Sequence, residues 1–421
     1  MKRPNCLVLF AWLITTQASV AASAVAPAPE PTGYHPALDG YVRFLGRQKQ
    51  PPVEYILTLF ENYDIVVFCE RAHPELTQYD LLYDLAGHPR FQREVGHVFT
   101  EVGSSASDAV VESLVGDATL TTNQVEEKLR YLARNLDFGG VWDKTNIYNF
   151  LRKLQGLNRS LPKERRVHVY PSGIPFRWED ATADSLKDFR RRLNQRDHLM
   201  AQNIIRKFNE LRRTDQRKKA LVIMNYRHAF PHLRPEQGRA VENTAGFLME
   251  AFPGRLANVM LNSVRILPGS TDNQVEITAL QQGKWDAAFA VLGNPNLGFD
   301  LKDSPLGTDT FDYFPLTPAH LRYQDVFTGF VFYQPLANHC MSFGLPGLID
   351  ASFAVELARR RRLEGRDESP AQIGQELARL ETLRLSGYED TSIFSRSDCG
   401  AAIQRWLESR PDERPLPCGF R

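Results

Sequence analysis

The sequence has no excess of charge of either sign, because 51 Lys and Arg residues balance 50 Asp and Glu residues to give a net charge of +1. A balanced charge gives no electrostatic reason to bind nucleic acid or a membrane surface. Beyond the N-terminal segment, no stretch approaches the roughly 18 uninterrupted apolar residues of a membrane-spanning helix. We therefore expect no nucleic-acid partner and no integral membrane segment in the mature chain.

Three common site motifs are missing as well. The turn after the first expected strand, residues 70–75, contains no glycine, which argues against a phosphate-binding or dinucleotide-binding loop. No Gly-x-Ser-x-Gly sequence is present, which argues against a serine hydrolase of the nucleophile-elbow type. No Cys-x-x-Cys pair is present either, so neither a zinc–thiolate site nor covalently attached haem is expected.

The N-terminus has the features of an export signal. Lys2 and Arg3 precede an apolar stretch over residues 6–14, and the small residues 22–24 match a cleavage site of the Ala-x-Ala type. We therefore expect residues 1–24 to be a signal peptide and the mature protein to be periplasmic or secreted.

Cysteine is scarce, with five residues in the whole chain. Four of them remain after the expected cleavage, and an even number in an oxidising compartment permits two disulfides. Cys399 and Cys418 lie in a C-terminal tail bounded by Pro and Gly, so we predict that they pair. The pairing of Cys69 and Cys340 stays open.

Short apolar runs alternate with helical stretches along the middle of the chain. The runs expected to be strands are residues 64–68, 97–100, 167–170, 220–224, 259–267, 287–292 and 327–333. Strands separated by helices predict an α/β fold of three layers, in which a mostly parallel sheet is sandwiched between helices.

The same pattern predicts how the chain is divided. From about residue 350 it is helical with no further strand, which indicates a C-terminal helical appendage. The expected parts are a signal peptide (1–24), a leader with a first helix (25–52), an α/β domain (53–345) and a helical extension (346–421).

Three of the expected strands run into an acid or a histidine. Glu70 and His73 follow the first strand, Glu101 the second and His228 the fourth. Because the carboxyl ends of parallel strands meet at one edge of a sheet, we expect these side chains to lie together. A histidine takes a proton from water near neutral pH, and a neighbouring carboxylate orients its ring. Two histidines and two glutamates would equally suit a divalent metal that holds a water.

Five residues near these strand ends are candidates for binding substrate. They are Arg71, Glu75, Trp178, Tyr226 and Arg227. For the two aromatic residues, packing in the core is the commoner fate.

The order of these motifs resembles a known superfamily. Glu70-Arg-Ala-His73 after a strand is similar to the Gly-Glu-x-x-His motif of the erythromycin esterase-like superfamily, which includes the ChaN-like haem-binding lipoproteins and the Tiki metalloproteases. Glu101 matches the acid that ends the family's second strand. Residues 195–204 resemble the family's helical segment Arg-Asp-x-x-Met-Ala-x-Asn, and His228 falls where the second histidine is expected.

The resemblance implies an exported hydrolase that acts on an ester or a peptide-like substrate. His73 would activate water, Glu70 and Glu101 would support it, and His228 would be an additional catalytic group. In the metalloprotease branch the equivalent residues would hold a metal. The alternative is a periplasmic protein that binds haem or a metal without catalysis. The substrate, the metal dependence and the oligomeric state stay open.

Overall fold

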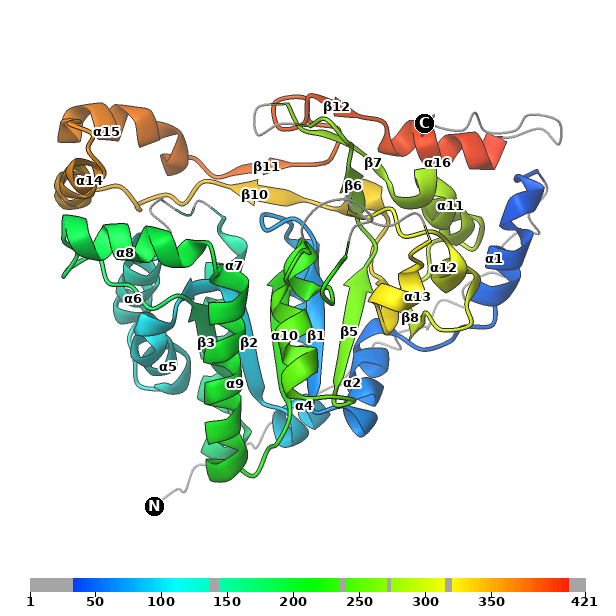
Figure 1. Ribbon diagram of the computed structural model, residues 1–421, viewed down its shortest axis with the longest axis horizontal. Helices are drawn as coiled ribbons and strands as arrows, with labels where there is room; N and C mark the ends of the chain where they lie inside the picture. Colours follow the sequence, from blue (N-terminus) through cyan, green and yellow to red (C-terminus); the bar gives the residue numbers. More distant parts are fainter. Residues whose placement is uncertain are drawn as a thin grey trace, which may run out of the picture. The chain divides into compact units, whose positions relative to one another are not determined.

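The centre of the fold is a seven-stranded sheet with the strand order β3-β2-β4-β1-β5-β9-β8 (Figure 1). The structure is a computed structural model that describes residues 33–136, 142, 144–234, 240–270, 274–314 and 320–408. The strands are β1 (Ile65–Glu70), β2 (His97–Ser104), β3 (His168–Gly173), β4 (Ala220–Asn225), β5 (Leu256–Leu261), β8 (Leu297–Asp300) and β9 (Gly329–Phe332). Six of them are parallel, and β8 runs antiparallel to β9 at the edge.

The sequence of β1 explains its place in the middle of the sheet. Its six residues are all buried, which is typical of an inner strand of a parallel sheet that is covered on both faces. Alternate side chains enter two separate cores: Val67 and Cys69 face one, and Val66 and Phe68 face the other.

Helices cover both faces of the sheet. The face of Val67 is covered by α1 (Asp39–Leu45), α9 (Arg196–Thr214), α10 (Thr244–Ala251) and α11 (Lys284–Val291). The face of Val66 is covered by α2 (Pro52–Asn62), α3 (Thr77–Gly87), α4 (Pro89–Glu94), α5 (Asp108–Gly116), α6 (Thr122–Arg134) and α7 (Asn146–Ser160). The predicted three-layer α/β fold with a mostly parallel sheet is confirmed.

Two small sheets and several short helices complete the described part. β10 (Met341–Phe343) pairs with β11 (Arg384–Ser386), and β7 (Glu276–Ala279) lies between β6 (Val264–Ile266) and β12 (Arg396–Ser397). The remaining α-helices are α8 (Ala183–Leu193), α12 (Pro305–Thr308), α13 (Tyr323–Val326), α14 (Ala351–Leu363), α15 (Pro370–Leu377) and α16 (Cys399–Glu408). The 3-10 helices are η1 (Pro36–Leu38), η2 (Ser105–Ser107), η3 (Lys163–Arg165), η4 (Tyr226–Ala229), η5 (Leu280–Gly283), η6 (Leu336–Asn338) and η7 (Ala378–Glu381).

Three expectations about the strands were wrong. Residues 287–292 were expected to be a strand but lie mostly in α11, where Phe289 stacks on Phe332 of β9 at 3.9 Å between ring centroids. A short apolar run fits a buried helix as well as a strand, and only the packing partner decides. Residues 259–267 form two strands of different sheets instead of one. The C-terminal extension is not purely helical, because it contains β11 and β12.

Several expectations concern residues outside the described ranges. The signal peptide and Cys418 both lie there, so export and the Cys399–Cys418 pairing stay predictions. The described cysteines Cys69, Cys340 and Cys399 form no disulfide with one another. Among the described residues, we find no helix whose length and apolar character would let it span a bilayer.

The edge of the sheet depends on two glycines that lie against Tyr55 of α2. A Cβ atom at Gly329 would lie 1.8 Å from the Tyr55 hydroxyl oxygen, and one at Gly298 would lie 2.5 Å from Tyr55 Cβ. Tyr55 is fixed in this position because its hydroxyl donates a hydrogen bond to Asp300 Oδ1 at 2.8 Å. A side chain at either glycine would therefore push α2 away from the sheet.

We predict that Gly329→Ala lowers the free energy of unfolding by about 1–3 kcal/mol, the usual cost of overpacking a core. Gly374→Ala in α15 is the matched control, because a Cβ there has no neighbour within 4 Å. Urea unfolding of both variants is the measurement. Equal stability of Gly329→Ala and the wild type would show that α2 does not pack on the sheet in this way.

Candidate functional site

The four ionisable side chains expected at the strand ends come together at one edge of the sheet. His73 Nε2 lies 3.9 Å from Glu101 Oε1, and His228 Nε2 lies 3.5 Å from the same oxygen. Glu70 lies next to His73. Two histidines from different strands therefore point the same ring nitrogen at one carboxylate.

The Glu70 carboxylate orients the first histidine. His73 Nδ1 lies 2.7 Å from Glu70 Oε2, and Tyr79 of α3 donates its hydroxyl hydrogen to Glu70 Oε1 at 2.8 Å. Asn146 at the start of α7 donates to the carbonyl oxygen of His73 and so holds the loop. Because Glu70 accepts the Nδ1 hydrogen, Nε2 is the basic nitrogen of His73. The His73 side chain is 23% exposed and can meet water.

The second histidine has an equivalent carboxylate partner, Asp197 of α9. His228 Nδ1 lies 2.5 Å from Asp197 Oδ1. The backbone N–H and the hydroxyl of Thr244 also donate to this oxygen, each at 2.9 Å. Arg227 binds the other oxygen at 3.0 Å. The turn that places His228 here begins at Tyr226, whose φ of 46° is in the left-handed region that non-glycine residues seldom adopt.

Glu101 and Arg196 form the centre of the cluster. Arg196 Nη1 donates to Glu101 Oε1 at 3.0 Å and lies 3.4 Å from His228 Nε2. The backbone N–H of Asn225 donates to the other oxygen of Glu101 at 2.9 Å. A buried carboxylate is thus fixed by a charge and a backbone donor, and it faces both histidine rings.

The electrostatic consequences differ between the acids and the base. Burial raises the pKa of Glu101, but the charges of His228, His73 and Arg196 outweigh it and lower the pKa to about 2. Burial likewise raises the pKa of Asp197, while the hydrogen bond and charge of His228 bring it below its usual range. Burial lowers the pKa of His73, but the charge and hydrogen bond of Glu70, with the charge of Glu101, raise it above its ordinary value. The acids stay charged, and His73 becomes a stronger base.

In this arrangement the cluster does not fit a metal ion. The Arg196 guanidinium lies where a cation shared by Glu101 and His228 would be placed. Glu70 and Asp197 each accept a hydrogen bond from a histidine Nδ1, so these two carboxylates orient the rings. Within the described ranges, no group of three or more His, Cys, Asp or Glu side chains is arranged to hold a metal.

Arg71 and Glu75, two of the candidate substrate-binding residues, are inaccessible. Their side chains are fully buried in an ion pair of 2.9 Å. Arg71 also donates to the carbonyl oxygens of Asn262 and Tyr333, at 2.7 and 2.6 Å. The expectation that they bind substrate does not fit this placement; they tie the loop of His73 to the ends of β5 and β9 instead.

The other three candidates have different surroundings. Trp178 is buried in a separate cluster and donates its indole N–H to the Leu136 carbonyl oxygen, so it does not line the site. Tyr226 donates its hydroxyl hydrogen to the Tyr313 carbonyl oxygen and shapes the turn before His228. Arg227 is about one-third exposed and borders the site through Asp197. It alone of the five combines exposure with contact to the cluster.

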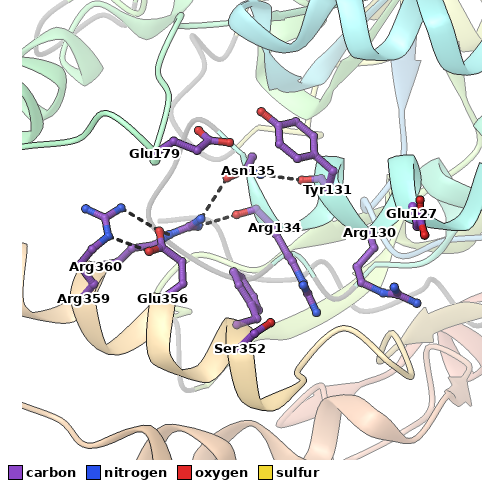
Figure 2. A pocket seen from close by; sticks show the side chains of 11 residues that line it. Glu127, Arg130, Tyr131, Arg134, Asn135, Glu179, Ser352, Glu356, Arg359 and Arg360 are labelled. Carbon is purple, nitrogen blue, oxygen red and sulfur yellow. Dashed lines mark hydrogen bonds and ion pairs between the residues drawn. The ribbon is translucent and has the colours of Figure 1, made fainter. Parts of the chain in front are cut away.

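A cavity of about 430 Å³ lies between α6 and α14, and Figure 2 shows the charged side chains that line it. Arg359 and Arg360 both bind Glu356, and Arg360 also donates to Asn135 Oδ1 at 3.0 Å. These arginines are therefore occupied by the protein's own acceptors. A cavity of about 440 Å³ lies between α2 and β8. Neither histidine of the site lines these two cavities, so they give no support to haem binding.

Three residues that complete the site were given no role from the sequence. Arg196 and Asp197 lie in the segment 195–204 that resembles a family motif, and this was the signal that could have revealed them. Tyr79 had no such signal, because an isolated tyrosine in a helix is normally a core residue. Its contact with Glu70 depends on how α3 packs against β1.

Comparisons with known proteins add little beyond the fold. No known protein-family model matches the sequence, and no curated protein matches it significantly. A mutant of erythromycin esterase EreC in its open conformation aligns with 71% of this chain and 96% of its own, at 10% identity and a TM-score of 0.43. A protein from Bacillus cereus aligns with 70% of this chain and 97% of its own, at 8% identity and a TM-score of 0.42. These values describe only a distant likeness of fold, so a function for this chain must rest on its own residues.

We predict that Glu75→Gln lowers the free energy of unfolding by about 3–5 kcal/mol, because it leaves the buried charge of Arg71 without its counter-ion. Burial raises the pKa of Glu75, but Arg71 opposes it and lowers the pKa to about 2. The stabilisation from Glu75 is therefore present above its unfolded pKa and is lost as the pH falls toward 2. Urea unfolding between pH 7 and pH 2 measures both effects.

Glu61→Gln is the control for this experiment, since Glu61 pairs with Arg90 on the surface at 2.9 Å. Its effect should stay below about 1 kcal/mol. A Glu75→Gln variant with the stability and pH dependence of Glu61→Gln would contradict the role given to the buried pair.

Proposed function

We propose that the protein is a hydrolase that activates water with His73 and acts on an ester-type carbonyl without a metal. The observation that carries this proposal is the pair of carboxylate-bound histidines, Glu70–His73 and Asp197–His228, whose Nε2 atoms both face Glu101. Each ring is held by its Nδ1, which leaves Nε2 for chemistry. A general base held in this way fits the removal of a proton from water.

In the proposed reaction, His73 Nε2 takes a proton from a water while the water oxygen attacks the carbonyl carbon. The negative charge that develops on the carbonyl oxygen is stabilised by the Arg196 guanidinium, which is held in place by Glu101. The protonated His73 then gives its proton to the leaving oxygen as the carbon–oxygen bond breaks. Tyr79 and Glu70 keep the ring oriented through both proton transfers.

His228 is proposed as the group that positions Arg196. Its Nδ1 bond to Asp197 fixes the ring, and its Nε2 lies within 3.4 Å of Arg196 and 3.5 Å of Glu101. From this position it can accept a hydrogen bond from the guanidinium and keep Arg196 aimed at the reacting carbonyl. We further propose that the enzyme works after export, in the periplasm or outside the cell, on the basis of the N-terminal sequence.

We predict that His73→Ala lowers kcat/KM for p-nitrophenyl acetate by about 10²–10⁴-fold, the usual contribution of a positioned base. His228→Ala should also lower it, by at least about tenfold, because Arg196 loses a partner. His168→Ala is the matched control, since His168 pairs with Glu112 outside the cluster. Unchanged activity in both His73→Ala and His228→Ala, measured on pure protein, would refute the proposed function.

A pH profile tests the same mechanism independently. His73 must be neutral to act as a base, and its pKa is raised above the ordinary value of about 6.5. We therefore predict that kcat/KM rises with pH along a limb whose midpoint lies above 6.5. Glu70→Gln removes the main charge that raises this pKa, so the midpoint should move to lower pH while the plateau falls.

Glu112→Gln serves as the control for the pH profile, because it removes a carboxylate from His168 and leaves His73 untouched. Its midpoint should equal that of the wild type. A limb that stays at the same pH in Glu70→Gln would mean that a group other than His73 supplies the base.

A further inference from the structure

The imidazole ring of His73 has a contact that the proposed mechanism does not use. Trp142 packs against it in a T-shaped arrangement, with 4.9 Å between the ring centroids and 71° between the ring planes. The Trp142 side chain is half-buried. Aromatic rings at this separation and angle attract one another. The indole therefore occupies space into which the imidazole could otherwise turn.

The part of the chain just before α7 also holds the backbone of His73. Asn146, four residues after this tryptophan, donates to the carbonyl oxygen of His73. Thr145 Oγ1 donates to Ser342 Oγ of β10 at 2.9 Å. The backbone N–H of Ser342 in turn donates to the carbonyl oxygen of Pro74 at 2.8 Å. The ring and the backbone of this histidine are therefore fixed by the same part of the chain, which is itself bound to β10.

The charged groups that face His73 come from several elements. Burial lowers its pKa, the charge and hydrogen bond of Glu70 with the charge of Glu101 raise it, and the charge of Arg196 lowers it. The net effect is a raised pKa. From the side of the tryptophan, Lys144 Nζ lies 5.6 Å from the centre of the indole ring. Water beside the histidine would weaken both the burial and these charges, so the pKa would return toward its ordinary value.

We propose that Trp142 is a positioning residue for the base: its indole holds the His73 ring on Glu70 and keeps Nε2 aimed at Glu101. Its effect on the reaction rests on the hydrolase function proposed above. A ring that turned away from Glu70 would move Nε2 away from the attacking water, and a small misplacement of a catalytic group costs up to about 100-fold in rate. The indole also keeps water from the hydrogen bond between His73 and Glu70, which strengthens that bond.

An NMR titration of the mature protein with ¹⁵N-labelled histidine tests this role without a substrate. The resonances of His73 are those that disappear in His73→Ala. Trp142→Ala should lower the pKa of His73 toward the ordinary value of about 6.5, because water then screens the charge of Glu70. Trp142→Phe keeps an aromatic ring at this position, so its pKa should stay close to that of the wild type.

Kinetics with p-nitrophenyl acetate give the second readout. Trp142→Ala should lower kcat by about 10–100-fold and leave KM nearly unchanged, because the indole positions the base and does not bind the ester. Trp142→Phe should recover most of this loss.

Trp406→Ala is the matched control. Trp406 packs against His35 in the same T-shaped way, with 5.1 Å between the ring centroids, and this pair lies outside the cluster. The control should leave the pKa of His73 and kcat unchanged. Thermal unfolding of all the variants shows that they fold.

The negative results can be told apart. A Trp142→Ala variant with the pKa and the kcat of Trp406→Ala would overturn the positioning role and leave the proposed hydrolase in place. A raised KM with an unchanged kcat would also overturn it, because Trp142 would then bind substrate. A wild type that does not hydrolyse the ester would overturn the proposed function, and the NMR titration would still decide whether Trp142 positions His73.

Discussion

The buried ion pair between Arg71 and Glu75 is the contact on which the site depends. It lies directly after β1. Arg71 also donates to the carbonyl oxygens of Asn262 and Tyr333, at the ends of β5 and β9. On the other side of β1, Asn225 at the end of β4 donates to the carbonyl oxygen of Arg71. The loop that carries His73 is therefore tied to three strands. An isolated buried pair is weak evidence of stability, but here Arg71 also donates to carbonyl oxygens at the ends of two strands.

The two faces of the sheet contribute different halves of the cluster. Glu70 receives Tyr79 from α3 on one face, whereas Glu101 receives Arg196 from α9 on the other. Both histidines lie in turns that follow the strands, so their rings can meet at the edge of the sheet. The carboxylates that they face, Glu70 and Glu101, are bound by helices on opposite faces of the sheet. The relative positions of the side chains in the site therefore depend on the packing of both helical layers against β1, β2 and β4. Such a site is pre-organised by the whole fold and not by one loop.

The parts that could be predicted from the sequence are those governed by short-range patterns. The apolar run before Glu70 predicted β1, and the acid or histidine after each of three strands predicted which side chains share an edge. The strand expected at residues 287–292 failed because Ala287 and Phe289 fit a buried helix equally well. Tyr79 and Asp197 could not be assigned from spacing, since their contacts with Glu70 and His228 depend on how α3 and α9 pack against the sheet. The burial of Arg71 could not be predicted for a related reason: a charged residue at a strand end is usually exposed, and Arg71 is buried because Glu75 and the carbonyl oxygens after β5 and β9 accept its hydrogen bonds.

The nature of the central cation decides which chemistry the cluster can perform. A divalent metal between Glu101 and His228 would bind water and lower its pKa, and the histidines would then be ligands. A guanidinium cannot bind water as a ligand or lose a proton, but its N–H groups can donate to a developing oxyanion. With Arg196 in this position, the deprotonation of water must come from another group. Glu101 is held as a charged acid of very low pKa, whereas the pKa of His73 is raised. In the proposed hydrolase the arginine therefore leaves the role of base to His73, and the Tyr79–Glu70 contact would be the means by which the fold controls that base.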